Sequence, residues 1–134
     1  MNTQVMAKQK KQEVIAKTEN PLVPARIVRS VPRVDILEDA DQLLLIAELP
    51  GVSADSLEIK FANDTLTLRG TRQPDITGKP VLGQLVVMEY SRSFVLPQGI
   101  DATKISAKLV NGLLEVHLPK AASYKPRVIA VKTA

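Results

Sequence analysis

The 134-residue sequence contains no cysteine and no tryptophan, and only two Phe and two Tyr. Without cysteine the chain can form neither a disulfide framework nor a thiolate metal site. This composition fits a reducing compartment, so we expect a cytoplasmic protein. No apolar run approaches the roughly 20 residues that a membrane-spanning helix needs. The N-terminus also lacks the apolar segment and small-residue cleavage site of a secretory signal.

Histidine is equally scarce, because His117 is the only one. It alternates with Val116 and Leu118, which predicts a solvent-facing position on a strand. One histidine without cysteine cannot form the usual zinc sites, and nothing in the sequence suggests the nucleophile and acid of a triad. The glycines are isolated from one another, so no phosphate-binding loop is present. We therefore expect no enzyme, no catalytic residue, no metal and no cofactor.

The charge is small and unevenly placed. The net charge is +4, but residues 1–33 carry seven Lys or Arg against two acids, and residues 34–134 carry eleven against twelve. A nucleic-acid-binding domain would need a basic patch on its folded surface, for which this body has no excess. Neither nucleic acid nor a membrane is the expected partner. Binding of anionic lipid or nucleic acid through the basic arm remains an alternative.

The sequence divides into an arm, a body and a tail. In residues 1–30, Pro21 and Pro24 interrupt any helix, so we expect an arm that is partly helical or disordered. In residues 31–120 apolar side chains recur at every second position, which is typical of half-buried strands. Residues 121–134 form a loose tail. The acidic residues Glu38, Asp39 and Asp41 fall between two strands, which favours a solvated turn over a cation site.

Seven or eight short strands are predicted in the body. Asn63-Asp64 and Asn111-Gly112 predict two tight hairpins. Residues 43–47 form a continuous apolar run, suited to a strand covered on both faces. The other strand signals are Val34 and Ile36; Leu57, Ile59 and Phe61; Leu66 and Leu68; residues 81–88 and 90–96, after a loop at 70–80; Ile105, Ala107 and Leu109; and Leu114, Val116 and Leu118. Strands and turns without helices between them predict an all-β, antiparallel β-sandwich.

Three segments together resemble the small heat-shock protein family with its α-crystallin domain. They read VPRVDILEDADQLLLIAELPGV at residues 31–52, RSFVLP at 92–97, and AKLVNGLLEV at 107–116 before Pro119-Lys120. The likeness spans residues 31–120. It implies an immunoglobulin-like sandwich and an ATP-independent holdase chaperone that binds unfolding client proteins in the stress response.

The resemblance also implies how copies of the chain associate. In bacterial and plant members a loop strand is exchanged, which here pairs residues 81–88 with the partner's residues 34–37. The dimer interface then contains Val34, Ile36, Val86, Met88 and Arg92. Ile129 and Val131 resemble the tail anchor that joins dimers into a homo-oligomer. Its expected groove is lined by Leu57, Ile59, Phe61, Ile105, Ala107 and Leu109.

Two features depart from the family pattern. The connection between Met88 and Arg92 is short and lacks glycine, and residues 1–30 contain no aromatic residue. Fewer rigid apolar contacts suggest weaker client capture, smaller oligomers or capture through the grooves of the sandwich. An alternative function is a monomeric co-chaperone or adaptor of the related sandwich type, which docks on one defined partner.

Overall fold

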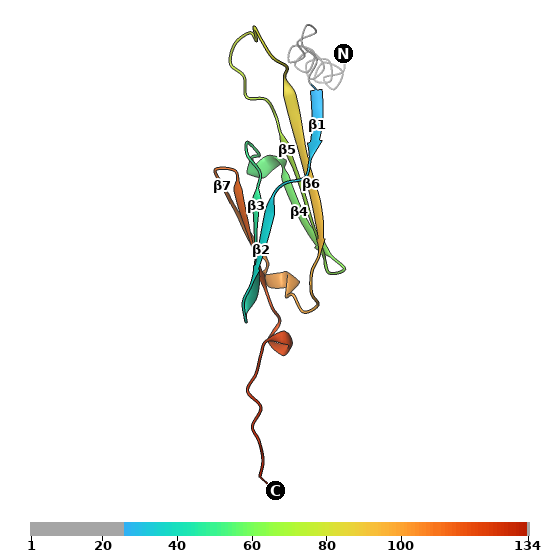
Figure 1. Cartoon of the computed structure of the whole chain (residues 1–134), viewed down its shortest axis with the longest axis vertical. Coiled ribbons are helices and arrows are strands. Elements are labelled where there is room, and N and C mark those ends of the chain that lie inside the picture. Colours follow the sequence, from blue (N-terminus) through green and yellow to red (C-terminus); the bar gives the residue numbers. More distant parts are fainter. Residues whose placement is uncertain (1–25, 134) are drawn as a thin grey trace, which may run out of the picture.

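The computed structural model describes residues 26–133. Two four-stranded sheets pack face to face as a β-sandwich, which confirms the predicted fold (Figure 1). One sheet has the strand order β1-β6-β5-β4 and the other β2-β3-β8-β7. The strands are β1 (Arg26–Ser30), β2 (Val34–Glu38), β3 (Gln42–Glu48), β4 (Leu57–Ala62), β5 (Thr65–Arg72), β6 (Val86–Val95), β7 (Ser106–Val110) and β8 (Leu113–Pro119). Short 3-10 turns lie at η1 (Ala54–Ser56), η2 (Ala102–Lys104) and η3 (Ala122–Tyr124).

The core lies between the sheets and is almost entirely aliphatic. Alternate side chains of β3, β5 and β8 are fully or nearly fully buried, as the period of two predicts. The buried hydrophobic core of the described chain consists of Leu43, Leu45, Ala47, Leu49, Val52, Leu66, Leu68, Tyr90, Leu96, Leu114, Val116 and Leu118. Because the sheets bury aliphatic side chains from both inner faces, the fold does not depend on an aromatic core.

Both predicted tight hairpins are present. Asn63 and Asp64 adopt positive φ of 51° and 57° between β4 and β5, and Asn111 and Gly112 adopt 50° and 78° between β7 and β8. Positive φ at both central residues is the two-residue turn that matches the twist of the flanking strands. A Cβ on Gly112 would lie 2.9 Å from the Cα of Pro50, so the second hairpin also needs glycine for close packing.

Two expectations for the region after the long loop are wrong. Residues 81–88 and 90–96 do not form two strands, because β6 is one strand whose residues 88–95 all pair with β5. The break falls earlier, where Pro80 and Gly83 end the extended pairing and leave residues 81–85 in the loop. Gly83 has a φ of +93°, a conformation outside the strand region that glycine adopts readily, so the chain cannot continue as a strand through this residue.

Two further expectations need correction. Residues 26–30 belong to the sandwich as β1, which pairs in parallel with residues 86–90 of β6, so the arm does not extend to residue 30. The β-branched pair Ile27-Val28 suits this edge position. Strand β3 is covered on one face only, because Leu44 and Ile46 stay half-buried on the outer face of their sheet. The helix predicted within residues 1–30 lies outside the described residues.

The two ends of the sandwich carry different extensions. The loop between β5 and β6 rises beyond one end of the sandwich, and the C-terminal tail leaves from the other end (Figure 1). No helix among residues 26–133 is long and apolar enough to cross a membrane.

Candidate interaction edges and tail

The edge strands of the two sheets form two opposite sides of the sandwich. β1 and β2 are joined by only three residues and are the first strands of their sheets, so they share one side. β4 and β7 therefore share the other side, where each is the last strand of its sheet. An edge strand presents unpaired backbone N–H and C=O groups to any extended segment that can add to it.

The residues expected to line the anchor groove lie on the side formed by β4 and β7. Leu57, Ile59 and Phe61 alternate with exposed residues on β4, and all three are half-buried against the core. Ile105, just before β7, and Leu109, within it, are half-buried in the same way from the other sheet. The structure thus places these side chains along one side of the sandwich. Ala107 lies between them and is exposed.

The two residues expected to form the tail anchor are largely exposed to solvent. Ile129 is 76% exposed and Val131 is 91% exposed, on an extended segment that points away from the sandwich (Figure 1). Large aliphatic side chains at such exposure have no intramolecular burial to stabilise them. The tail and the groove are separate within one described chain, so a contact between them requires either a reversal of the tail or a second molecule.

The residues expected at the dimer interface fall into two groups. Val34 and Ile36 lie on the open edge of β2, where Val34 contacts the core and Ile36 is 42% exposed. Val86 and Met88 instead lie on β6, opposite Arg26 and Val28 of β1. Met88 also pairs with Arg72 of β5. The backbone of Met88 is therefore paired on both sides within its own chain.

Arg92 is the fifth expected interface residue, and it makes contacts inside the chain. Its Nη1 donates a hydrogen bond to the carbonyl oxygen of Pro32 at 3.0 Å, and its guanidinium lies 4.8 Å from the ring centroid of Phe94. Pro32 is buried and links β1 to β2. Arg92 therefore fastens the crossover between the two sheets, directly beside the open edge of β2.

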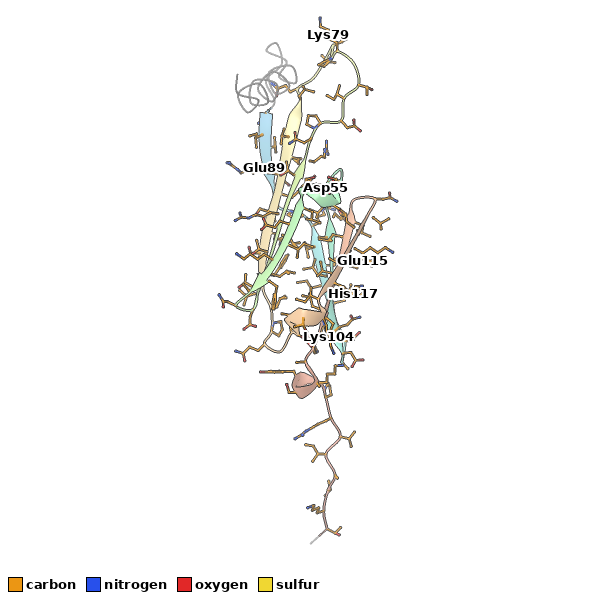
Figure 2. The ribbon with its side chains drawn as sticks, turned by 180° about the vertical axis from the view of Figure 1, so that it is seen from behind. Asp55, Lys79, Glu89, Lys104, Glu115 and His117 are labelled. Carbon is orange, nitrogen blue, oxygen red and sulfur yellow. The ribbon has the colours of Figure 1, made fainter. Side chains whose placement is uncertain are left out.

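Three further exposed aliphatic residues lie within the segments that are expected to pair between copies, residues 81–88 and 34–37. Val81 and Leu82 in the long loop are 98% and 97% exposed, and Leu37 on β2 is 56% exposed. The sequence could have predicted that Val81 and Leu82 lie in the loop, because two residues between Pro80 and Gly83 cannot form the middle of a paired strand. Figure 2 shows Lys79 at the far tip of this loop, well clear of the sandwich.

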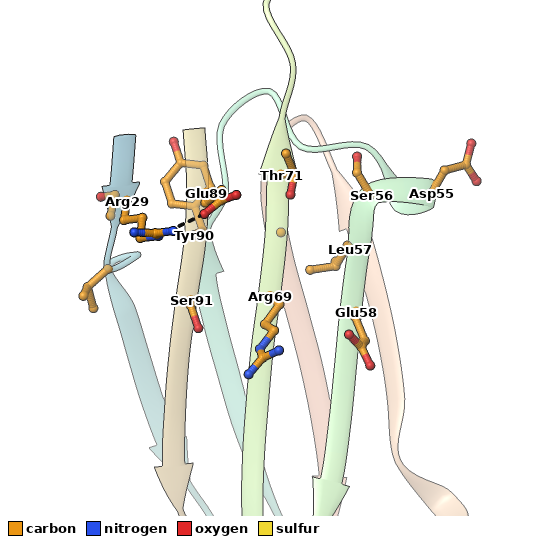
Figure 3. Close-up of a pocket in the computed structure, with 13 residues that line it drawn as sticks. Arg29, Asp55, Ser56, Leu57, Glu58, Arg69, Thr71, Glu89, Tyr90 and Ser91 are labelled. Carbon is orange, nitrogen blue, oxygen red and sulfur yellow. Dashed lines mark hydrogen bonds and ion pairs between the residues drawn. The ribbon is translucent and has the colours of Figure 1, made fainter. Parts of the chain in front are cut away.

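A hollow of about 720 Å³ lies on the outer face of the first sheet (Figure 3). Arg29 of β1 and Glu89 of β6 form an ion pair of 3.2 Å at its rim, and Arg69 and Glu58 line it from β5 and β4. The hollow is shallow and mixed in charge. Its side chains lie on an open sheet face, where water screens them and no acid–base pair is isolated.

The turn between β2 and β3 is the solvated turn that the sequence predicted. The Oδ1 of Asp39 accepts hydrogen bonds from the backbone N–H of Asp41 at 2.7 Å and of Gln42 at 2.8 Å. These two bonds, with the nearby charge of Lys120, lower the pKa of the exposed Asp39 carboxyl. Among the described residues, no group of three or more His, Asp or Glu is placed to hold a metal ion.

His117 lies on the outer face of β8, as predicted. Its Nδ1 is 3.2 Å from the Oε1 of Gln42, and its Nε2 is 4.0 Å from a carboxylate oxygen of Glu115 (Figure 2). The side chain is 39% exposed. These contacts hold a surface imidazole in place without bringing a nucleophile to it.

Comparison with known proteins defines the class of this sandwich. Residues 35–132 match the Hsp20/alpha crystallin family. The chain belongs to this family, the small heat-shock proteins, and the membership supports a chaperone role.

Individual relatives agree with this assignment. The chain is 37% identical over 90 residues to a probable 15 kDa heat shock protein of Leptospira interrogans, which covers 66% of this chain and 69% of the relative. It is 37% identical over 93 residues to the 18 kDa heat shock protein of Clostridium acetobutylicum, covering 66% and 61%. The chain thus spans roughly two thirds of the length of these relatives.

Solved structures show the same fold. Heat shock protein 16.0 from Schizosaccharomyces pombe superposes with a TM-score of 0.61 at 30% identity, over 77% of this chain and 99% of that one. A small heat-shock protein from Xylella fastidiosa gives 0.59 at 31% identity, over 79% and 100%, and is described as having a distinct high order structure.

Proposed function

We propose that this protein is an ATP-independent holdase that binds unfolding proteins and keeps them from aggregating. The observation that carries the proposal is the set of open strand edges, three of which carry exposed aliphatic side chains: Ile27 on β1, Ile36 and Leu37 on β2, and Val110 on β7. An unfolding client exposes extended backbone and apolar side chains, which are the two features that such an edge can bind. Neither feature requires a nucleotide.

We also propose that the working form is a homo-oligomer built from strand-exchanged dimers. Arg33 accepts a hydrogen bond from Glu48 N–H at 2.9 Å, and Asp39 N–H donates to the carbonyl of Gln42 at 3.0 Å. The odd-numbered residues between 33 and 39 therefore point their backbone N–H and C=O groups towards β3. Because the direction alternates along a strand, Val34, Ile36 and Glu38 direct theirs at the open edge.

The projecting loop supplies a segment that can add to this edge. Residues 81–85 lie in this loop, with bends at 81–83, and Val81 and Leu82 are almost fully exposed. Neighbouring side chains of a strand point to opposite faces, so one of the two would cover Ile36 of a second copy and continue its core. Residues 86–88 are already part of β6, so we limit the exchanged segment to residues 81–85.

We propose further that Ile129 and Val131 dock in the groove between β4 and β7 of a neighbouring molecule. Side chains two residues apart in an extended segment point to the same side, so both can enter one groove. A cytoplasmic location is the compartment we propose with this function, and fractionation of cells would test it.

A heat-aggregation assay tests the holdase function. A heat-labile protein is warmed in nucleotide-free buffer with increasing amounts of this chain, and turbidity is recorded. We expect suppression that saturates near one subunit per client molecule. Turbidity that is unchanged at several-fold excess would rule out the proposal. Size-exclusion chromatography with light scattering tests the assembly, because a monomer at working concentration would favour a one-partner adaptor.

A further inference from the structure

The tail does not become free directly at the end of the last strand. Residues 120–125, which we call the joint, are fastened to two turns of the sandwich before the exposed segment begins. Lys120 forms an isolated antiparallel bridge with Ile100, and its N–H donates to the carbonyl of Asp41 at 2.8 Å. The N–H of Ala121 donates to the carbonyl of Gly99 at 2.7 Å. The backbone of the joint is thereby hydrogen-bonded to both flanking turns.

Lys120 reinforces this attachment with its side chain. Its Nζ lies 2.8 Å from a carboxylate oxygen of Glu38 and donates to the carbonyl oxygen of Asp39, also at 2.8 Å. The side chain of Lys120 is only 18% exposed, which is low for a lysine. Partial burial and two oxygen partners restrict the side chain to one geometry, unlike a surface ion pair in which both groups stay mobile.

Tyr124 attaches the end of the joint to a second turn. A Cβ on Gly99 would lie 2.3 Å from the Cγ of Tyr124, so the ring packs directly on the glycine backbone. Gly99 has a φ of +97°, which also favours glycine. The N–H of Tyr124 donates to the carbonyl of Ala121 at 2.9 Å, and this closes the 3-10 turn η3.

Beyond Lys125 the chain changes character. Residues 126–133 are exposed and make no hydrogen bond or ion pair with the rest of the described chain. Lys125 is extended, with φ −78° and ψ 147°, as a residue before proline prefers. Ile129 follows Lys125 by four positions, so the two Cα atoms can be at most about 14 Å apart. Figure 1 shows this segment continuing away from the sandwich.

We propose that the joint sets the direction of the tail and presents Ile129 and Val131 to a neighbouring molecule rather than to the groove of their own chain. Lys120 and Tyr124 are its positioning residues. A tail free from Pro119 onward could reverse towards its own sandwich, but the contacts of Lys120, Ala121 and Tyr124 hold the joint so that the tail leaves away from it (Figure 1). The inference rests on the tail anchor of the proposed function.

The test compares joint variants with an anchor variant by native mass spectrometry. We expect Lys120→Met, Tyr124→Ala and the double variant to lose the single dominant oligomer size and to spread over smaller species. Lys120→Arg keeps the charge and should restore the wild-type distribution. Lys132→Met is the matched control, because Lys132 lies beyond the anchor and has no ion pair within the described chain.

A spin label on Thr133→Cys provides a readout that general destabilisation would not move. The label is unambiguous because the chain has no native cysteine. In isotopically diluted mixtures, the wild-type label should broaden groove resonances of other chains, and the joint variants should shift this broadening towards the labelled chain itself. Tyr124→Ala is the safer variant for this measurement, because Tyr124 is 57% exposed and outside the sandwich.

The outcomes separate the joint from the anchor. If Ile129→Ala with Val131→Ala breaks up the oligomers while the joint variants keep wild-type size and intermolecular broadening, the inference is wrong and the anchor stands. If the anchor variant itself keeps wild-type oligomers, the proposed anchor is wrong.

Discussion

The interior of the sandwich and its two extensions use the same residue types for opposite purposes. Leu45 and Val116 are completely buried between the sheets, whereas Val81 and Val131 are 98% and 91% exposed in the loop and the tail. Burial of an aliphatic side chain stabilises a fold by roughly 1.5–3 kcal/mol, and an exposed one contributes nothing until a partner covers it. The interior therefore determines whether one chain folds, whereas the proposed function assigns the association of chains to the extensions. This separation predicts that each region can be damaged without the other.

The largest effect is expected in the interior. Leu45→Ala removes a fully buried side chain from the centre of β3 and should lower the free energy of unfolding by about 2–5 kcal/mol. Leu82→Ala is the matched control, because the same substitution at a 97% exposed position should change stability by less than about 0.5 kcal/mol. Urea titration followed by circular dichroism measures both. Equal losses would show that the loop is part of the folded core.

The next effect is expected in the tail and should leave the fold intact. Ile129→Ala with Val131→Ala removes two anchors, each worth on the order of 1.5–3 kcal/mol before costs. Ordering the tail costs roughly 1–2 kcal/mol per residue, so one anchor is weak and many act together in a closed assembly. We expect native mass spectra to shift towards dimers while the melting of each sandwich is unchanged.

A control for the tail prediction lies next to the anchor. Val128→Ala changes another aliphatic residue, 99% exposed, that is one residue from Ile129 and points to the other side. It should retain wild-type oligomers. Dimers that dissociate together with the larger oligomers in the double variant would contradict a separate dimer contact.

Arg92 contacts the crossover beside the open edge of β2, so its substitution should affect both the stability of the sandwich and the association of chains, each to an intermediate extent. Arg92→Ala removes the hydrogen bond to Pro32 and the contact with Phe94, and leaves a buried carbonyl without its donor, which costs about 1–3 kcal/mol. The crossover beside β2 should loosen, which lowers the melting temperature and weakens the dimer. Arg92→Lys keeps the charge but not the planar fork, so it should recover only part of the loss. Unchanged melting and dimer affinity for Arg92→Ala would show that the crossover is held by other contacts.

The smallest expected effect is on the pH dependence of stability, through the carboxyl group of Asp39. The pKa of Asp39 is lowered in the folded chain by hydrogen bonds from Asp41 and Gln42, so its carboxylate stabilises the fold above the unfolded pKa. That contribution is lost as the pH falls through the lowered folded pKa. Asp39→Asn keeps an oxygen acceptor but does not titrate, so its melting temperature should fall less between neutral and acidic pH than that of the wild type. Parallel pH curves for the two proteins would contradict this role.

The sequence predicted the sandwich and both tight hairpins because these depend on local patterns. Strand period and turn chemistry at Asn63-Asp64 and Asn111-Gly112 are encoded within a few neighbouring residues. It did not predict β1, because a parallel edge pair between residues 26–30 and 86–90 joins segments that are far apart in the chain. It also placed the start of β6 too early, since the aliphatics at 81–82 carry strand propensity that Pro80 and Gly83 override.

The sequence could predict which residues belong to the candidate site, but not the contacts that their side chains make. The residues expected to line the groove follow from the alternation along each strand. That they lie on one side of the sandwich follows from the strand order of the two sheets, which only the structure gives. The hydrogen bond from Arg92 to Pro32 spans 60 residues and depends on a side-chain direction that no local pattern records. The same holds for the contacts of Lys120 with Glu38 and Asp39.

The most direct test of the chaperone role measures client bound to the protein after heating. A heat-labile protein is warmed with this chain in nucleotide-free buffer, and the soluble fraction is separated by size and quantified for both components. We predict soluble complexes that contain both proteins at a ratio near one subunit per client, and no gain on adding ATP. Client that stays soluble without co-eluting, or that precipitates regardless of the amount of chain, would contradict the holdase function.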